Sequence, residues 1–319
     1  MSAPGGRRVA LLAAALVAGC AALLRLLPHV WGYRFDAPQR VFLGIGYLPG
    51  DFRQYAALAA QARDGAGALL ANEFTTQPHD PRLLALFASL TGWTTRLVGG
   101  SVEAVVWASH ALQLVAILAF FALAWRLFGR FFPDDGARLR AFVLLAFSGG
   151  LEWLLWSLGG VLPAATAGPL VGLTWPVRSW NTFEGLFAPY QVAGYASLLL
   201  LWNLYLDGVE RRRAAPLAGA VLCVPLVYAF HGYTAFFLAA TLGTAFGFAL
   251  LAGGRAPSRW ELSGLGALLA AFALPLGLNL WQRQDPVYAA VLANAVAHDL
   301  PAPLWIWPLT FGALLLFNK

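Results

Sequence analysis

Long apolar runs joined by short charged connections make up most of this chain. The first run extends from Val9 to Leu27, and runs of similar length recur from residue 103 onward. An α-helix needs about 20 apolar residues to cross the roughly 30 Å hydrocarbon core of a bilayer. The pattern therefore predicts an all-α fold, a polytopic bundle of about eight membrane-spanning helices. The expected spans are residues 9–27, 103–125, 141–162, 186–206, 215–230, 233–252, 262–281 and 302–318.

The composition excludes a soluble globular domain. Of the 319 residues, 60% are hydrophobic and only 11% are charged, whereas a soluble domain carries about 25% charged residues. Cys20 and Cys223 both lie inside apolar runs, so we expect buried packing residues rather than a disulfide or metal ligands. We expect one membrane domain over residues 1–319. The chain stops at Lys319 directly after an apolar run, which indicates a piece of a longer protein.

The arginines predict which side of the membrane each connection occupies. Residues 83–98 are apolar, but they are few and they include Arg96. If this segment crossed the membrane, the arginines of three later short connections would lie outside, against the positive-inside rule. We therefore expect a surface or re-entrant helix at 83–98 and a cytoplasmic amino terminus. The inside connections then carry Arg126, Arg130, Arg138 and Arg140, then Arg211, Arg212 and Arg213, then Arg255 and Arg259.

The formal net charge of +6 comes from arginines of this kind, at the ends of expected spans. The arginines mark span ends, and they form no basic face interleaved with stacking aromatics, so no nucleic-acid partner is expected.

Residues 29–101 form a long outer loop in this topology, and its segment 47–82 is the longest polar stretch of the chain. The stretch 53–64 contains helix-forming residues with Tyr55, Leu58 and Ala59 on one side, which predicts a helix lying on the membrane surface. Much later in the chain, the expected span 215–230 is short for a bilayer. We therefore expect the bend that follows it, at His231, to lie below the outer membrane surface.

Asp51 follows Pro49 and Gly50 and precedes the predicted surface helix. One interpretation is an N-cap, in which the carboxylate accepts hydrogen bonds from the free N–H groups of the first turn. The other is a carboxylate held at the membrane surface, where it takes a proton from a hydroxyl group or holds a metal ion. The two interpretations are compatible, because a capping carboxylate is also a positioned one.

The outer loop resembles that of a known family. Gly50, Asp51, Tyr55 and Ala59 follow the pattern G-D-x-x-x-Y-x-x-x-A. Together with the order of spans and surface helices over residues 9–252, this is similar to the GT-C superfamily of integral-membrane glycosyltransferases, which includes protein O-mannosyltransferases and aminoarabinose lipid A transferases.

The resemblance implies an enzyme of the bacterial inner (plasma) membrane that takes a sugar from a polyprenyl-phosphate donor. It implies a lipid, glycan or protein acceptor at the outer face. Asp51 would be the general base that deprotonates the acceptor hydroxyl, which then attacks the anomeric carbon with inversion.

Polar residues of three outer segments are candidates for substrate binding. For each segment a structural interpretation stays open: a solvated turn, interfacial anchoring beside Trp175 and Trp180, or an interhelical contact. His110 and Glu152, inside expected spans, have the same two interpretations. No metal site is predicted, and dependence on a divalent metal is left open. The substrate-binding candidates are Arg53, Tyr55, Glu73, His79, Asp80, Arg82, Arg178, Asn181, Glu184, Tyr190, Gln191, His231 and Tyr233.

Two functions of other classes remain as alternatives. A transporter would be expected to show inverted repeats and broken helices at the bilayer midplane, and the sequence shows neither. A non-catalytic scaffold, or an inactive fragment of a transferase, agrees with the stop after an apolar run.

Overall fold

Most of the chain that the structure describes is helical. The computed structural model describes residues 4–34, 49–72, 75–147, 188–232, 234–235, 238 and 258–290.

Four helices among these residues are long and apolar enough to span a membrane. They coincide with four of the expected spans, which confirms the prediction of a helical protein and makes these four helices candidate membrane spans. The expected spans at 302–318 and most of 141–162 and 233–252 lie outside the described residues, so the total of about eight stays a prediction. The four helices are Gly6–Leu27, Val102–Phe131, Pro189–Arg211 and Arg259–Gln282.

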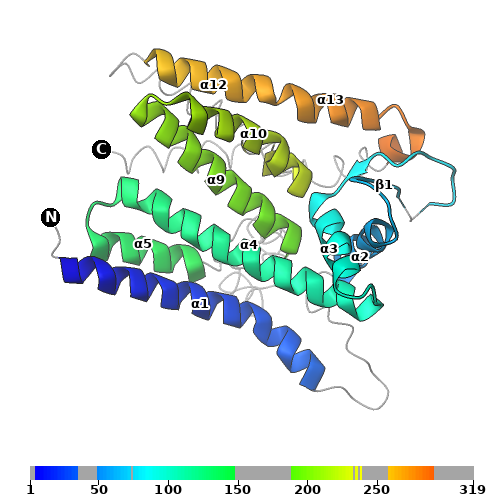
Figure 1. The fold of residues 1–319 in the computed structure, drawn as a ribbon, viewed down its shortest axis with the longest axis horizontal. Helices are drawn as coiled ribbons and strands as arrows, with labels where there is room; N and C mark the ends of the chain where they lie inside the picture. The colour runs from blue at the N-terminus through cyan, green and yellow to red at the C-terminus, as the bar shows by residue number, and fades with distance from the viewer. Residues whose placement is uncertain are drawn as a thin grey trace, which may run out of the picture.

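The long helices pack side by side. Helix α4 (Val102–Phe131) lies between α1 (Pro4–Arg34) and α9 (Pro189–Arg211), and α5 (Asp135–Phe147) packs against both α1 and α4 (Figure 1). On the far side of α9 lies α10 (Ala214–Phe230), whose 17 residues extend about 25 Å. The sequence predicted this short helix.

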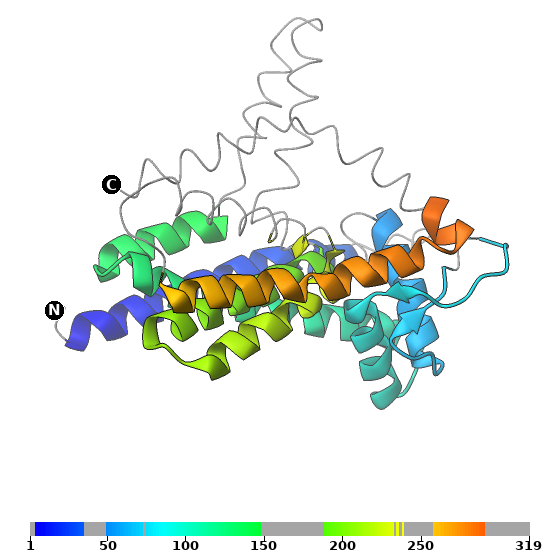
Figure 2. The ribbon, with the colours of Figure 1, turned by 90° about the horizontal axis from the view of Figure 1, so that it is seen from above.

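Helices α12 (Arg259–Ala271) and α13 (Ala273–Gln282) follow one another as a nearly continuous rod along the bundle (Figure 2). The rod begins with a capping box, in which the Ser258 hydroxyl accepts from the Glu261 N–H and the Glu261 carboxylate accepts from the Ser258 N–H. This reciprocal cap satisfies backbone donors that have no partner within the helix.

Small residues on α1 face the bundle, while most of its leucines face outward. Ala14 and Ala21 are buried against Phe121 of α4 and its neighbours. Leu12 and Leu16, on the other face of α1, remain 71% and 69% exposed. Cys20 of α1 is exposed too, so the prediction of a buried packing residue is wrong for Cys20, whereas Cys223 is buried as predicted. Small residues let membrane helices approach closely, and lipid tails are apolar enough to solvate leucine. The outward leucines therefore indicate a face suited to lipid contact.

The segment predicted to be the outer loop, and called so below, forms a layer at one end of the bundle (Figure 1). This layer contains α2 (Pro49–Arg63), α3 (Leu86–Leu97) and a short antiparallel pairing of β1 (Leu69–Leu70) with β2 (Leu83–Leu84). The all-α prediction did not include this pairing. Helix α3 has 12 residues and extends about 18 Å, too short to cross the hydrocarbon core. This length agrees with the surface or re-entrant helix expected at 83–98.

Helices α2 and α3 pack against each other through a glycine. A methyl group added at Gly92 would lie 2.7 Å from the Ala62 Cβ atom, and it would lie still closer to the Ala59 carbonyl oxygen. No side chain other than hydrogen fits this contact. The two helices therefore form one compact unit, with Leu58, Ala59 and Ala88 in its core.

Candidate functional site

Three rings from three separate elements meet where the outer-loop layer contacts the bundle. Tyr55 of α2 stacks on Tyr190 of α9, with ring centroids 4.2 Å apart and planes 7° from parallel. The ring of His231, just beyond α10, lies 5.4 Å from the Tyr190 ring at an angle of 44°. We call Tyr55, Tyr190 and His231 the aromatic cluster. All three had been predicted as substrate-binding residues.

Local sequence explains how Tyr190 reaches this position. Helix α9 begins at Pro189, whose fixed φ and missing N–H suit a first helical turn, so Tyr190 lies at the very start of the helix. Tyr190 is only 7% exposed and packs with Phe87 of α3 and Ala193. The tyrosine therefore joins the first turn of a spanning helix to both helices of the outer loop.

His231 approaches α9 at a glycine. A Cβ atom at Gly194 would lie 2.9 Å from the Cβ atom of His231, so glycine is what permits this approach. The Nδ1 atom of His231 is hydrogen-bonded to the Thr234 hydroxyl at 2.7 Å. Burial lowers the pKa of His231, which lies in the turn outside the spanning helices, from 6.5 to about 4. The ring is therefore neutral near pH 7, available as a hydrogen-bond donor or acceptor rather than as a cation.

Asp51 belongs to the first turn of α2. The helix begins at Pro49 rather than after Asp51, so the N-cap interpretation of Asp51 is wrong and the residue occupies the third helical position. A carboxylate in the first turn is still favourable there, because the helix dipole is positive at that end. Residues four apart in a helix lie on the same side, so position 51 lies one turn from Tyr55. The side chain of Asp51 is outside what the structure describes.

His79 is held within the loop that connects β1 to β2. Its Nε2 atom accepts from the Asn72 N–H at 2.9 Å, so Nδ1 carries the proton and donates to the Gln77 carbonyl oxygen at 2.8 Å. The ring also contacts the edge of Tyr288. These contacts use both ring nitrogens of His79 to shape the loop.

Arg82 docks the same loop on α13. Its Nη1 atom donates to the Trp281 carbonyl oxygen at 2.8 Å, and its guanidinium lies 4.9 Å from the centroid of the Trp281 ring. The Gln282 amide donates to the Arg82 carbonyl oxygen at 2.7 Å. Asp80 is largely exposed, 3.6 Å from an Arg82 nitrogen. Arg82 and His79 therefore organise the loop, at a place distinct from the aromatic cluster.

The other predicted residues fall into two groups. Arg53 is exposed on α2, and Gln191 is half-buried in the first turn of α9. The remaining candidates lie outside the described residues, as does Glu152. They are Glu73, Arg178, Asn181, Glu184 and Tyr233.

A buried polar cluster lies between α1 and α4, and of its members only His110 had been singled out in the sequence, as an interhelical contact or a functional residue. Arg25 lies 2.8 Å from the His29 Nε2 atom and donates to the Gln113 side-chain oxygen at 3.4 Å. The ring of His110 lies 4.3 Å from that of His29. Each of these side chains is less than 9% exposed. The signal was present in the sequence, since Arg25 and His29 stand four residues apart at the end of the first apolar run, on one side of a helix.

Comparisons give no relative from which a function can be transferred: no family model, no curated protein and no solved structure matches the chain. Among the residues that the structure describes, no three His, Cys, Asp or Glu side chains gather so as to hold a metal ion. A functional argument therefore rests on the aromatic cluster and the helix that carries Asp51.

Proposed function

We propose that this protein is a membrane glycosyltransferase that moves a sugar from a polyprenyl-phosphate donor to an acceptor hydroxyl at the outer face. The observation that carries the proposal is the convergence of Tyr55, Tyr190 and His231. Tyr55 lies one helical turn after position 51 on the same helix. The three residues of the cluster come from the outer loop, the start of a spanning helix and a helix bend.

In the proposed reaction Asp51 is the general base. Its carboxylate takes the proton of the acceptor hydroxyl, whose oxygen attacks the anomeric carbon of the donor sugar. The bond between that carbon and the phosphate oxygen breaks, and polyprenyl phosphate leaves with the bonding electron pair. Placing a base on the attacking hydroxyl contributes about 100- to 10,000-fold to such a reaction.

The aromatic cluster would position the sugar-binding surface: Tyr190 is buried, so Tyr55, half-buried on α2, is the tyrosine that would contact the sugar. Tyrosine combines an apolar ring with a polar hydroxyl, which suits a site at the boundary between lipid and water. A neutral His231 would donate or accept one hydrogen bond without attracting unrelated anions. With the aromatic cluster assigned to binding, the carboxylate of Asp51 is the reactive group.

Transfer of labelled sugar from a panel of polyprenyl-phosphate donors, with the chain in liposomes, tests the proposal. Asp51→Asn should lower the rate by at least about 100-fold. Asp64→Asn is the matched control, because Asp64 is an exposed carboxylate just past the same helix, paired with Arg63 at 2.7 Å. Equal rates for the two variants would remove Asp51 from the mechanism. Solute movement across the liposome without sugar transfer would favour a transporter instead.

A further inference from the structure

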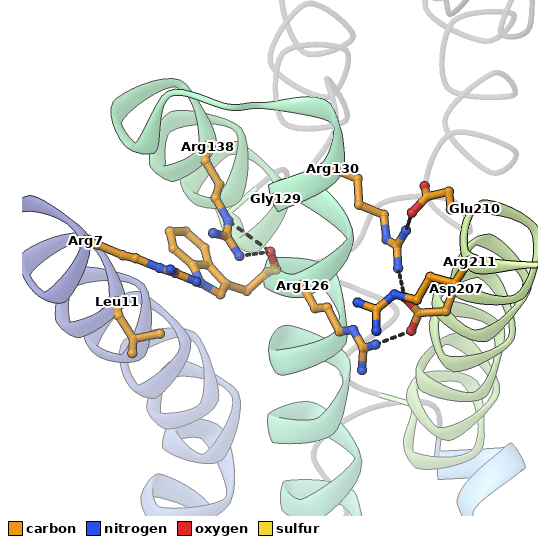
Figure 3. Close-up of a pocket in the computed structure, with 10 residues that line it drawn as sticks. Arg7, Leu11, Arg126, Gly129, Arg130, Arg138, Asp207, Glu210 and Arg211 are labelled. Atoms are coloured by element: carbon orange, nitrogen blue, oxygen red, sulfur yellow. Dashed lines mark hydrogen bonds and ion pairs between the residues drawn. The ribbon is translucent and has the colours of Figure 1, made fainter. Parts of the chain in front are cut away.

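The other end of the bundle contains a cavity of 520 Å³ that the proposed reaction does not use. It lies where the start of α1, the end of α4, the start of α5 and the end of α9 come together (Figure 3). Five arginines and two carboxylates line it. In the predicted topology this end faces the cytoplasm.

One wall of the cavity is a network of ion pairs. Arg126 and Arg130 of α4 both donate to the Asp207 carboxylate of α9, and Arg130 also donates to Glu210 (Figure 3). Arg211 lies 3.8 Å from Asp207 as well. Three guanidinium groups therefore share two carboxylates, and this wall keeps a positive charge in excess.

The opposite wall has arginines without a carboxylate among the lining residues. Arg138 of α5 donates to the Trp125 carbonyl oxygen at 3.0 Å, with its guanidinium 3.9 Å from the centroid of the Trp125 ring. Gly129 leaves room for it, since a Cβ atom there would lie 2.9 Å from the Arg138 Cζ atom. Arg7 of α1 extends toward the same space (Figure 3).

Arg138 and Arg7 also repel each other. Burial lowers the pKa of Arg138, Asp135 raises it, and the positive charge of Arg7 lowers it further. An anion between the two guanidinium groups would relieve this repulsion. The fixed stacking of Arg138 on Trp125 keeps its guanidinium in place for such an anion, at little entropic cost.

Charge and shape together indicate the ligand. Among the residues that line the cavity, five positive and two negative charges leave an excess of three positive charges, which Asp135, close enough to Arg138 to raise its pKa, offsets in part. Guanidinium groups form paired hydrogen bonds with phosphate oxygens, and basic pockets between membrane helices are known to hold lipid head groups. Leu11 lines the cavity one turn after Arg7, is 56% exposed, and adjoins the outward leucines of α1. The cavity thus combines cationic groups with an apolar surface beside the lipid-facing side of the bundle.

We propose that this cavity binds a phosphate group, carried either by an anionic phospholipid of the adjacent leaflet or by a soluble phosphate ester. Arg7 and Arg138 would contact the phosphate, and the ion-paired wall would supply the remaining positive potential. The inference is independent of the sugar transfer proposed for the other end of the bundle.

Lipid retention by the purified full chain tests this site. The chain is placed in phosphatidylcholine nanodiscs that contain a small fraction of phosphatidylglycerol, and the lipids retained after detergent extraction are counted by native mass spectrometry. Wild type should retain phosphatidylglycerol preferentially, and Arg7→Gln and Arg138→Gln should each lower its apparent affinity about fivefold. Arg96→Gln is the control, because Arg96 is an exposed arginine at the other end of the bundle. Arg7→Lys should retain most of the affinity.

A second arm separates the two sources of phosphate. Glycerol 3-phosphate is titrated onto the chain in pure phosphatidylcholine, with thermal stability as the readout. Stabilisation by glycerol 3-phosphate that Arg7→Gln abolishes, without preferential lipid retention, identifies a soluble ligand. Wild-type retention by both Arg7→Gln and Arg138→Gln, with no response to glycerol 3-phosphate, overturns the proposal. Arg138 donates to the backbone of α4, so Arg138→Gln can disturb folding. The contacts described for Arg7 include no such bond, and Arg7→Gln therefore decides the test if Arg138→Gln fails to fold.

Discussion

Tyr55 and Tyr190 stack with ring centroids 4.2 Å apart and planes only 7° from parallel, although one lies on an outer-loop helix and the other begins a spanning helix. Such a contact fixes the outer loop relative to the bundle. Because position 51 lies one turn before Tyr55, the stacking also fixes the height of the helix that carries Asp51. The relation of these two rings therefore links the fold of the outer loop to the proposed chemistry.

Loss of the stacking between Tyr55 and Tyr190 should lower the stability of the folded protein. We expect Tyr55→Ala to lower the free energy of unfolding by about 2 kcal/mol, less than the usual cost of truncating a fully buried aromatic side chain because Tyr55 is partly buried. Tyr55→Phe should cost less than about 1 kcal/mol because the ring remains. Thermal unfolding in detergent measures both. In a double-mutant cycle with Tyr190→Ala, the coupling energy should be about 1 kcal/mol. A coupling energy of zero would contradict the contact.

Gly92 provides a test of the α2–α3 packing. A methyl group at this position would lie 2.7 Å from the Ala62 Cβ atom and would also meet the backbone of α2. Gly92→Ala should therefore force the helices apart and lower the free energy of unfolding by about 1–3 kcal/mol. Gly266→Ala in α12 is the control, since nothing lies within 4 Å of its added Cβ atom. Comparable stability of the two variants would contradict the packing described.

Sequence reasoning succeeded where one physical quantity decided the outcome. The thickness of the hydrocarbon core sets the length of a span, and four apolar runs of that length are spanning helices by length and composition. The short helix at 215–230 and the outer-loop helix around Tyr55 were identified in the same way, from apolar length and helical periodicity.

Contacts between distant segments were beyond such reasoning. Nothing in the pattern around Arg82 reveals that it docks on Trp281, because that contact depends on where a loop meets helix α13 in space. The same holds for the pairing of Leu70 with Leu83, a β contact too short to produce an alternating pattern. Arg25 and His29 differ from these contacts, because their spacing of four residues at the end of the first apolar run already places them on one side of a helix.

The lowered pKa of His231 predicts sensitivity to acid. In the unfolded chain His231 takes up a proton near pH 6.5, whereas in the folded chain it does so only near 4. Stability should therefore be unchanged above about pH 6.5 and should fall by at most about 3 kcal/mol as the pH is lowered to 4. His231→Gln removes the titrating group, so thermal midpoints measured between these pH values should decline less than in wild type. An equal decline in both proteins would assign the acid sensitivity to other groups.

The buried cluster of Arg25, His29 and Gln113 allows a test by rescue. A buried guanidinium that loses a hydrogen-bond partner costs more than the roughly 1–3 kcal/mol of a neutral group, because it is charged, whereas removing the charged group as well avoids this cost. His29→Leu removes the group 2.8 Å from the guanidinium of Arg25 and should lower the free energy of unfolding. Adding Arg25→Met should restore much of that loss, because no buried charge then remains.

Sugar transfer by the same variants separates a packing role from a functional one. Ionisable side chains inside a membrane domain are expensive, and where they occur they usually serve function. If the cluster of Arg25 and His29 serves the proposed reaction, the double variant should be as stable as wild type and yet transfer sugar more slowly. Full activity in the stable double variant would show that the cluster only packs α1 against α4. Further destabilisation on adding Arg25→Met would contradict the pairing itself.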